Sequence, residues 1–302
     1  MTGTFRMSEI SRRSVLAGVA AASLAPRTAF AQAPGQAGPP PTAEEIAGVL
    51  PLRTTGLEHI AMIVPDVTVS ATFYSKLFNP DGLHKEQEGD LRYYVTLDPD
   101  PAAAQPIGYI AIGSRPAPPP PFLDHFCPLV VDYNAAAVAA RAEQEGFAPG
   151  RFGIMPDPDG LGLQLLGAPA GLAASTEPAT RIVNGDALVR PRGLDHVMLY
   201  VSDLDRSAAY YRSFFGPEAS RGGDPEQIWF ELADTRIGLQ RRAALEPARV
   251  DHFTVKTEPF DREAVTTELR LLGARVAPVD EADESLLRFR DPYGLGVALR
   301  PI

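Results

Sequence analysis

Four short apolar segments, each broken at the same place by an acidic residue followed by histidine, set the hydrophobic pattern of this chain. They read GLEHIAMIV (56–64), LDHFCPLVV (123–131), GLDHVMLYV (193–201) and VDHFTV (250–255). Each is rich in β-branched and apolar residues, which is typical of a β-strand. Four of the five histidines of the chain take the equivalent position in these segments. The pattern therefore predicts four repeated units, each of which begins with a strand.

The residues that follow each of these strands predict the rest of the unit. Asp66 is expected to cap a helix over VTVSATFYSKLF (67–78), whose apolar positions at 69, 73, 74 and 77 share one face. Residues 204–215 match this segment, with Asp203 as the matching cap. An alanine-rich helix is expected over about 135–145, and strands over 91–97, 107–112 and 161–166. An Asp-Pro-x-Gly turn precedes the last strand of the second and fourth units. The expected order is β-α-β-β-β, four times.

The repeats predict an α+β protein of two domains, each built from two units. Residues 56–167 form the first domain and residues 193–302 the second. The linker between them, 168–192, is rich in Ala, Gly, Thr and Pro and is expected to be a loop. Residues 32–55 are expected to be a tether rich in Pro and Ala, with a short helix from Thr42 to about Leu50.

Residues 1–31 resemble a targeting segment. The run SRRSVL (11–16) has the twin-arginine pattern, a mild apolar stretch follows it, and AFA (29–31) is a small-x-small cleavage site. We expect export by the twin-arginine translocase to the periplasm or the medium. The apolar stretch is too short and too weakly apolar for a membrane span, so we expect none in the mature chain.

The net charge and the cysteine content of the chain argue against two features, a nucleic-acid partner and an intramolecular disulfide. The formal net charge of the 302 residues is -10, which argues against a nucleic-acid partner. One cysteine, Cys127, excludes an intramolecular disulfide.

The repeated β-α-β-β-β order, the histidine on each first strand and the Asp-Pro-x-Gly turns resemble the vicinal oxygen chelate superfamily. This superfamily includes glyoxalase I, extradiol dioxygenases and the bleomycin and fosfomycin resistance proteins. The resemblance covers about residues 56–301 and is more specific for fold than for reaction. It implies that paired units form cupped mixed sheets, each able to hold one divalent metal (Fe, Zn, Mn, Ni or Co).

The resemblance also implies which residues hold the metal. These are His59, His125 and Gln164 in the first cup, and His196, His252 and Gln240 in the second. The superfamily usually places a metal-binding glutamate on the last strand of a unit. At this position the second unit has Gln164 and the fourth has Ala298, and the alignment puts the positions of the first and third units near Gly113 and Gln240. Because neighbours along a strand point to opposite faces, we expect Glu58, Asp124, Asp195 and Asp251 to face away from the cups.

The site without a carboxylate leaves two functions open. The first is an exported metal-dependent enzyme that acts on a small oxygenated substrate, with lyase, isomerase or dioxygenase-like chemistry. The second is a non-catalytic binder of a small molecule, like the resistance proteins. Cys127, Tyr94 and Trp229 are candidates to line the substrate site. Plain sheet packing explains Tyr94 and Trp229 equally well, and a buried inert thiol explains Cys127 better.

Overall fold

We describe the fold from a computed structural model of the chain. It describes residues 40–302 except 87–90, 99–107, 116–119, 148, 151–152, 170, 173–174, 224 and 280–282. The predicted targeting segment (1–31) and the first part of the tether lie outside the described residues. No helix among the described residues is long and apolar enough to cross a membrane.

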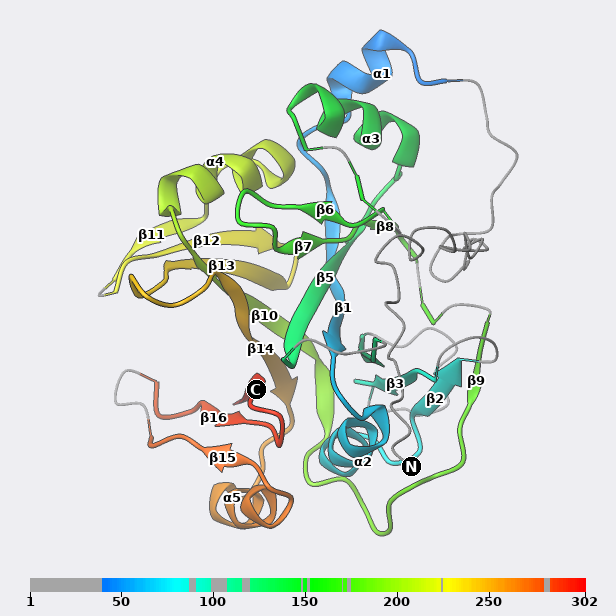
Figure 1. The fold of residues 1–302 in the computed structure, drawn as a ribbon, viewed down its shortest axis with the longest axis vertical. Coiled ribbons are helices and arrows are strands. Elements are labelled where there is room, and N and C mark those ends of the chain that lie inside the picture. Colours follow the sequence, from blue (N-terminus) through cyan, green and yellow to red (C-terminus); the bar gives the residue numbers. More distant parts are fainter. Residues whose placement is uncertain are drawn as a thin grey trace, which may run out of the picture.

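Four β-α-β-β-β units follow one another, as the sequence predicts (Figure 1). The first unit comprises β1 (Thr54–Ile63), α2 (Val67–Leu77), β2 (Leu83–Glu86), β3 (Tyr93–Thr96) and β4 (Tyr109–Gly113). The second comprises β5 (Phe122–Val130), α3 (Ala135–Gln144), β6 (Met155–Pro156), β7 (Gly162–Leu163) and β8 (Leu166–Gly167). The third comprises β10 (Pro191–Val201), α4 (Leu204–Phe215), β11 (Ser220–Gly222), β12 (Gln227–Leu232) and β13 (Thr235–Arg241). The fourth comprises β14 (Arg249–Thr257), α5 (Arg262–Leu271), β15 (Arg275–Val276), β16 (Leu287–Arg290) and β17 (Gly296–Pro301).

The first strands of the units pair at the centre of each half. β1 is antiparallel to β5, and β10 is antiparallel to β14. Each first strand also has a parallel neighbour from its own unit: β4 beside β1, β7 and β8 beside β5, β13 beside β10, and β17 beside β14. The two halves meet where Leu123 of β5 pairs with Val250 of β14. The histidines therefore lie at the centre of each sheet, where neighbouring strands hold the backbone on both sides.

The helices of the first and third units begin at aspartate N-caps and pack across to the other half. The Asp66 side chain accepts hydrogen bonds from the backbone at the start of α2, and Asp203 does the same for α4. The Tyr74 hydroxyl on α2 donates to Asp291 of the fourth unit at 2.9 Å. On α4, Tyr211 donates to Asp157 of the second unit at 3.2 Å. Both tyrosines are fully buried, so they belong to the core that joins the halves.

Some sequence predictions are corrected by the structure. Val69, expected on the apolar face of α2, is 43% exposed. The linker is not all loop, because β9 (Thr176–Pro178) pairs with β2 along the edge of the sheet. His84 lies on β2, a strand that the sequence did not indicate. The helix in the tether is confirmed as α1 (Ala43–Gly48), with Thr42 and Glu45 forming a capping box.

Candidate metal and ligand sites

A β-bulge places an acidic side chain beside each of the four histidines. Between Leu57 and His59, β1 advances two residues while its partner β5 advances one, from Pro128 to Cys127, so Glu58 is the extra residue. The same shift occurs at Asp124 on β5, Asp195 on β10 and Asp251 on β14. A bulge interrupts the alternation of side chains and re-aims them. The prediction that these four acids face away from the histidines is therefore wrong.

Each acid instead contacts the Nδ1 atom of the histidine that follows it. The distances are 3.0 Å for Glu58–His59, 2.8 Å for Asp124–His125, 2.5 Å for Asp195–His196 and 3.0 Å for Asp251–His252. Since an ionised carboxylate only accepts hydrogen bonds, an imidazole that is neutral in this arrangement carries its proton on Nδ1. Its Nε2 atom then presents a lone pair. Metal-binding histidines are held by carboxylates in the same way.

We call the site around His59 and His125 the N-terminal cup. The Nε2 atoms of these two residues lie 3.3 Å apart, and the rings meet edge to face. His59 is 1% exposed, and its ring stacks on Tyr109 with centroids 4.7 Å apart. Burial lowers the pKa of His125, so that ring is neutral at pH 7 although the Asp124 carboxylate favours its charged form. When the Nδ1 atoms of both rings carry the protons, the lone pairs of the two buried Nε2 atoms face each other.

The spacing of these nitrogens fits one divalent metal. A metal ion binds imidazole nitrogen at about 2.0–2.1 Å, so two such ligands at 90–110° are separated by roughly 2.9–3.4 Å. The observed 3.3 Å lies within this range. A cation between the nitrogens would also remove the repulsion between their lone pairs. The donor set therefore suits a metal, and imidazole serves most of the divalent ions expected from the sequence.

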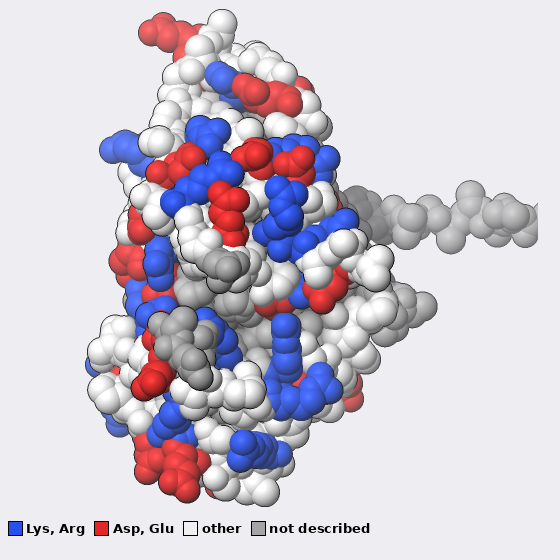
Figure 2. Space-filling view, turned by 90° about the vertical axis from the view of Figure 1, so that its left-hand side faces the viewer, with Lys and Arg blue, Asp and Glu red and all other residues white. Residues whose placement is uncertain are grey.

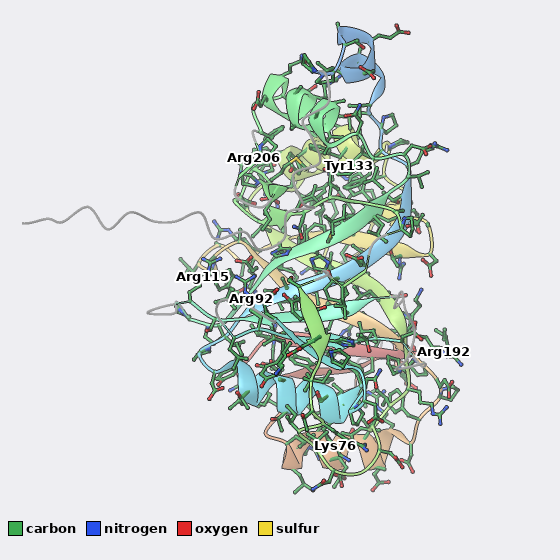
Figure 3. All side chains as sticks on the ribbon, turned by 90° about the vertical axis from the view of Figure 1, so that its right-hand side faces the viewer. Lys76, Arg92, Arg115, Tyr133, Arg192 and Arg206 are labelled. Atoms are coloured by element: carbon green, nitrogen blue, oxygen red, sulfur yellow. The ribbon has the colours of Figure 1, made fainter. Side chains whose placement is uncertain are left out.

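Two arginines stabilise the charge of the Asp124 carboxylate in the N-terminal cup. Although burial alone would raise it, the pKa of Asp124 is lowered by the hydrogen bond from His125 and by the charges of Arg115 and Arg92. The guanidinium of Arg115 lies 2.6 Å from Asp124. Both arginines lie side by side near one end of β5 (Figure 3). They keep this carboxylate ionised while it holds the imidazole.

The structure brings two further predicted residues to this cup. Gln164 is buried and directly follows β7, where the parallel register with β5 places it opposite Cys127. Its hydrogen bond to His125 favours the protonated form of that ring and so raises the pKa of His125. Ligand atoms of Glu58, His59 and Cys127 lie within 4.8 Å of one another. The thiol of Cys127 is fully buried and donates weakly to the Pro128 carbonyl oxygen, and burial raises its pKa. It is therefore protonated, and it fits the description of an inert buried thiol.

We call the site around His196 and His252 the C-terminal cup. It has the same pair of acid–histidine contacts as the N-terminal cup, but different side chains surround them. The two rings lie edge to face with centroids 5.6 Å apart. The Thr254 hydroxyl lies 3.1 Å from His196 Nε2 and donates to its lone pair. Burial lowers the pKa of His196 to about 4, against the effect of the Asp195 carboxylate. Thr254 is the counterpart of Cys127, so one of the two nitrogens that would bind a metal already has a partner here.

The strand register corrects the alignment of the last strands. Thr254 pairs with Ala298, as expected for the fourth unit. In the first and third units the equivalent pairs are Ala61 with Ala111 and Met198 with Gly238. Gln240 pairs instead with Tyr200 and accepts a hydrogen bond from Gln227 at 2.9 Å. The equivalent positions are therefore Ala111 and Gly238, two residues before Gly113 and Gln240.

Aromatic side chains close one cup and line the other. Tyr94 is buried, packs against Tyr109 and donates to Glu86, so it supports the wall of the N-terminal cup. Trp229 lies edge to face with His196 and lines a cavity of about 600 Å³ in the C-terminal cup. This cavity has the volume of a small-molecule site. Figure 2 views the face on which β11–β13 and β15–β16 lie, and shows basic side chains on both sides of a hollow.

Sequence reasoning missed the arginines of this cavity, which are Arg236, Arg275, Arg288, Arg290 and Arg300. A signal for two of them was present, because Arg288 and Arg290 alternate along the segment that leads directly into the Asp-Pro-x-Gly turn at 291–294, and alternate positions of a strand share one face. Arg236 also covers Trp229, with its guanidinium 4.8 Å from the ring centroid.

Comparison with known proteins shows that other proteins share this fold. Residues 193–299 match the model of the Glyoxalase/Bleomycin resistance protein/Dioxygenase superfamily. The 2,3-dioxygenase LapB from Pseudomonas sp. KL28 is similar in structure, with a TM-score of 0.58, 17% identity, and coverage of 82% of this chain and 92% of that one. The Mn(II)-bound glyoxalase from Novosphingobium aromaticivorans has a TM-score of 0.59 and 15% identity, with 82% of each chain covered. A 2,2',3-trihydroxybiphenyl 1,2-dioxygenase from Sphingomonas wittichii strain RW1 has a TM-score of 0.56 and 17% identity, with 82% and 90% covered.

These likenesses define a class. The protein has the vicinal oxygen chelate fold, in its arrangement of four β-α-β-β-β units. Its C-terminal half carries the sequence pattern of the glyoxalase and dioxygenase superfamily. Solved structures with this fold include a Mn(II)-bound glyoxalase and a catechol 2,3-dioxygenase.

Proposed function

We propose that this protein is a metal-dependent enzyme of the glyoxalase and dioxygenase type, with its metal in the N-terminal cup. The observation that carries the proposal is the 3.3 Å separation of the His59 and His125 Nε2 atoms, both on rings whose Nδ1 faces a carboxylate. The fold of the similar solved structures, one of them a Mn(II)-bound glyoxalase, supports it.

His59 and His125 would hold the metal, and the amide oxygen of Gln164 would be the third ligand. A divalent ion supplies positive charge that polarises an oxygen atom of the substrate and makes a proton next to it easier to remove. Because Gln164 adds no negative charge, the charge of the ion would remain available to an anionic or chelating substrate. Tyr109 stacks on His59 and fixes the plane of that ring. We therefore favour lyase or isomerase chemistry on a small oxygenated molecule over ring cleavage, for which a carboxylate ligand is usual.

The test compares matched histidine variants of the two cups. Protein purified after expression with mixed divalent metals is analysed for metal content, as wild type and as His59→Ala, His125→Ala, His196→Ala and His252→Ala. We expect about one ion per chain in wild type, and its loss only in the first two variants. The same proteins are assayed for proton exchange next to carbonyl groups by NMR in D₂O, and for oxygen consumption with catechols.

Three results would decide between the alternatives. Metal lost only with His196→Ala and His252→Ala would move the site to the C-terminal cup. Oxygen uptake with a catechol would favour the dioxygenase reaction. Metal-free protein that still binds a small molecule would favour the non-catalytic binder, for which the C-terminal cavity of about 600 Å³ gives room.

We also propose that residues 1–31 direct export by the twin-arginine translocase, so that the mature protein works in the periplasm or outside the cell. This route carries folded proteins, which allows metal loading in the cytoplasm. The proposal is supported by Arg12 and Arg13 ahead of an apolar stretch and a small-x-small site. Cell fractionation of wild type and of an Arg12→Lys, Arg13→Lys double variant tests it. Equal export of both would contradict it.

A further inference from the structure

The C-terminal cup gathers positive charge in a protein whose formal net charge is -10. Five arginines line its cavity: Arg236, Arg275, Arg288, Arg290 and Arg300. Asp251 and Asp283 also line it, and Asp195 contacts Arg236 and Arg300. Among the residues that the structure describes, the five arginines of this cavity thus outnumber the three aspartates. A cleft lined by one sign of charge concentrates ligands of the opposite sign.

Strand register aligns these arginines on one side of the sheet. Arg290 pairs directly with Arg275 across β15 and β16, and Arg288 lies two residues before Arg290 on the same face. Like charges directly opposite each other destabilise a sheet. Burial, together with the nearby charge of Arg300, lowers the pKa of Arg288. Asp251 binds Arg290 at 3.1 Å and offsets part of the repulsion between these arginines, and an anionic ligand would offset more of it.

The duplication provides an internal control, because the same positions in the N-terminal cup are uncharged. Arg236 pairs with His196, and its counterpart Tyr109 pairs with His59. Arg290 pairs with Gly296, and its counterpart Pro156 pairs with Gly162. Counting along the strands gives two further pairs of counterparts, Arg288 with Ile154 and Arg300 with Leu166. The fold therefore does not require arginine at these positions.

We propose that the C-terminal cup is a binding site for a small molecule with two or more anionic groups, carboxylates or a phosphate. Arg288 and Arg275 on one wall and Arg236 on the other would bind the anionic groups by paired, charge-assisted hydrogen bonds. Trp229 would contact the carbon skeleton. The cavity of about 600 Å³ holds a molecule of this size. The two cups would thus serve different purposes, metal binding in the first and anion binding in the second.

Calorimetric titration with succinate, tricarballylate and inorganic phosphate tests the proposal on the full chain at constant ionic strength set with chloride. We expect saturable binding of at least one probe, and a weakening of about tenfold or more in Arg288→Gln. The loss should be greater in Arg275→Gln, Arg288→Gln. Arg275 is exposed, so the single variant Arg275→Gln keeps the test valid if changes at Arg288 disturb folding. Preference for the carboxylates or for phosphate identifies the anionic group.

Two controls separate this site from general charge and from the metal site. Arg270→Gln, on the exposed end of α5, makes the same charge change away from the cavity and should leave binding unchanged. Binding should also persist in His59→Ala, His125→Ala, since it does not depend on the metal proposed for the other cup. The proposal is overturned if no probe binds saturably, if Arg270→Gln weakens binding as much as Arg288→Gln, or if binding disappears with the N-terminal histidines.

Discussion

The acids beside the histidines offer the sharpest test of the metal site. In Glu58→Gln and Asp124→Asn the side chain keeps its shape and an oxygen that accepts the Nδ1 proton, but it loses its charge. Removing a carboxylate that supports a metal-bound histidine typically weakens metal binding 10–100-fold, or about 1.4–2.7 kcal/mol. The variants should therefore bind metal more weakly while the histidines themselves remain.

The exposure of each acidic side chain determines how much metal affinity its substitution removes within this roughly 10–100-fold range. The Glu58 side chain is 2% exposed, whereas that of Asp124 is 16% exposed and also contacts Arg115. Water and the arginine charge screen Asp124 more, so we expect about a tenfold loss of affinity for Asp124→Asn and close to 100-fold for Glu58→Gln.

Competition against a chromophoric chelator, with Zn²⁺ and with Mn²⁺, measures these affinities directly. Asp251→Asn is the matched control, because it makes the same change beside His252 in the other cup. It should leave the affinity at wild-type level. If Glu58→Gln and Asp124→Asn both fold normally and bind metal as tightly as wild type, the reasoning from the carboxylate–histidine pairs is refuted.

Four other changes test the metal site, the contact between the halves and the packing of the strands. Gln164→Glu should tighten metal binding by about tenfold or more, because it adds a negative charge beside the ion, and weaker binding in the competition assay would contradict this. Tyr211→Phe leaves the buried Asp157 carboxylate without its hydroxyl donor, so the free energy of unfolding in urea should fall by about 1–3 kcal/mol, and an unchanged value would count against the contact. Burial raises the pKa of Asp157 to about 6, so between about pH 4 and pH 6 the folded chain holds a proton that the unfolded chain has released. The free energy of unfolding should therefore fall as the pH rises from about 4 through 6, and Asp157→Asn should lack this fall. Parallel pH profiles of the wild type and the variant would argue against this reasoning. An added Cβ at Gly162 would lie 2.7 Å from the Asp124 carbonyl oxygen, so Gly162→Ala should destabilise the fold by about 1–3 kcal/mol, unlike Gly48→Ala, whose Cβ meets nothing within 4 Å.

The sequence predicted those features whose signals are local. Each first strand, the Asp66 and Asp203 caps and the Asp-Pro-x-Gly turns depend on residues that are neighbours along the chain, and the structure confirms all of them. The edge strands β2 and β9 were missed because they are short and their pairing joins residues about ninety positions apart. The burial of Val69 was wrong because tertiary contacts select only part of the apolar face of α2.

The candidate site was predicted only as far as alternation along a strand allows. The four histidines were placed together correctly within their cups. The bulges were not predictable, because the extra residue appears only when the two strands are set side by side. A single inserted residue turned Glu58 from a supposed outward-facing acid into the partner of His59. The shift of two residues at Gln240 has a similar origin, since the register of β13 depends on its pairing with β10.

The same bulges explain how one frame can support two different sites. Each places an acid and a histidine from adjacent positions on one side of the strand, so the imidazole is oriented by its own neighbour rather than by a distant loop. What lies above that pair is then free to vary. In the N-terminal cup the thiol of Cys127 donates to the Pro128 carbonyl oxygen, and the two Nε2 atoms face each other. In the C-terminal cup the Thr254 hydroxyl makes a hydrogen bond to the Nε2 atom of His196. Thr254→Cys should therefore increase metal affinity in the second cup, and an unchanged metal content of that cup would show that this residue does not distinguish the two.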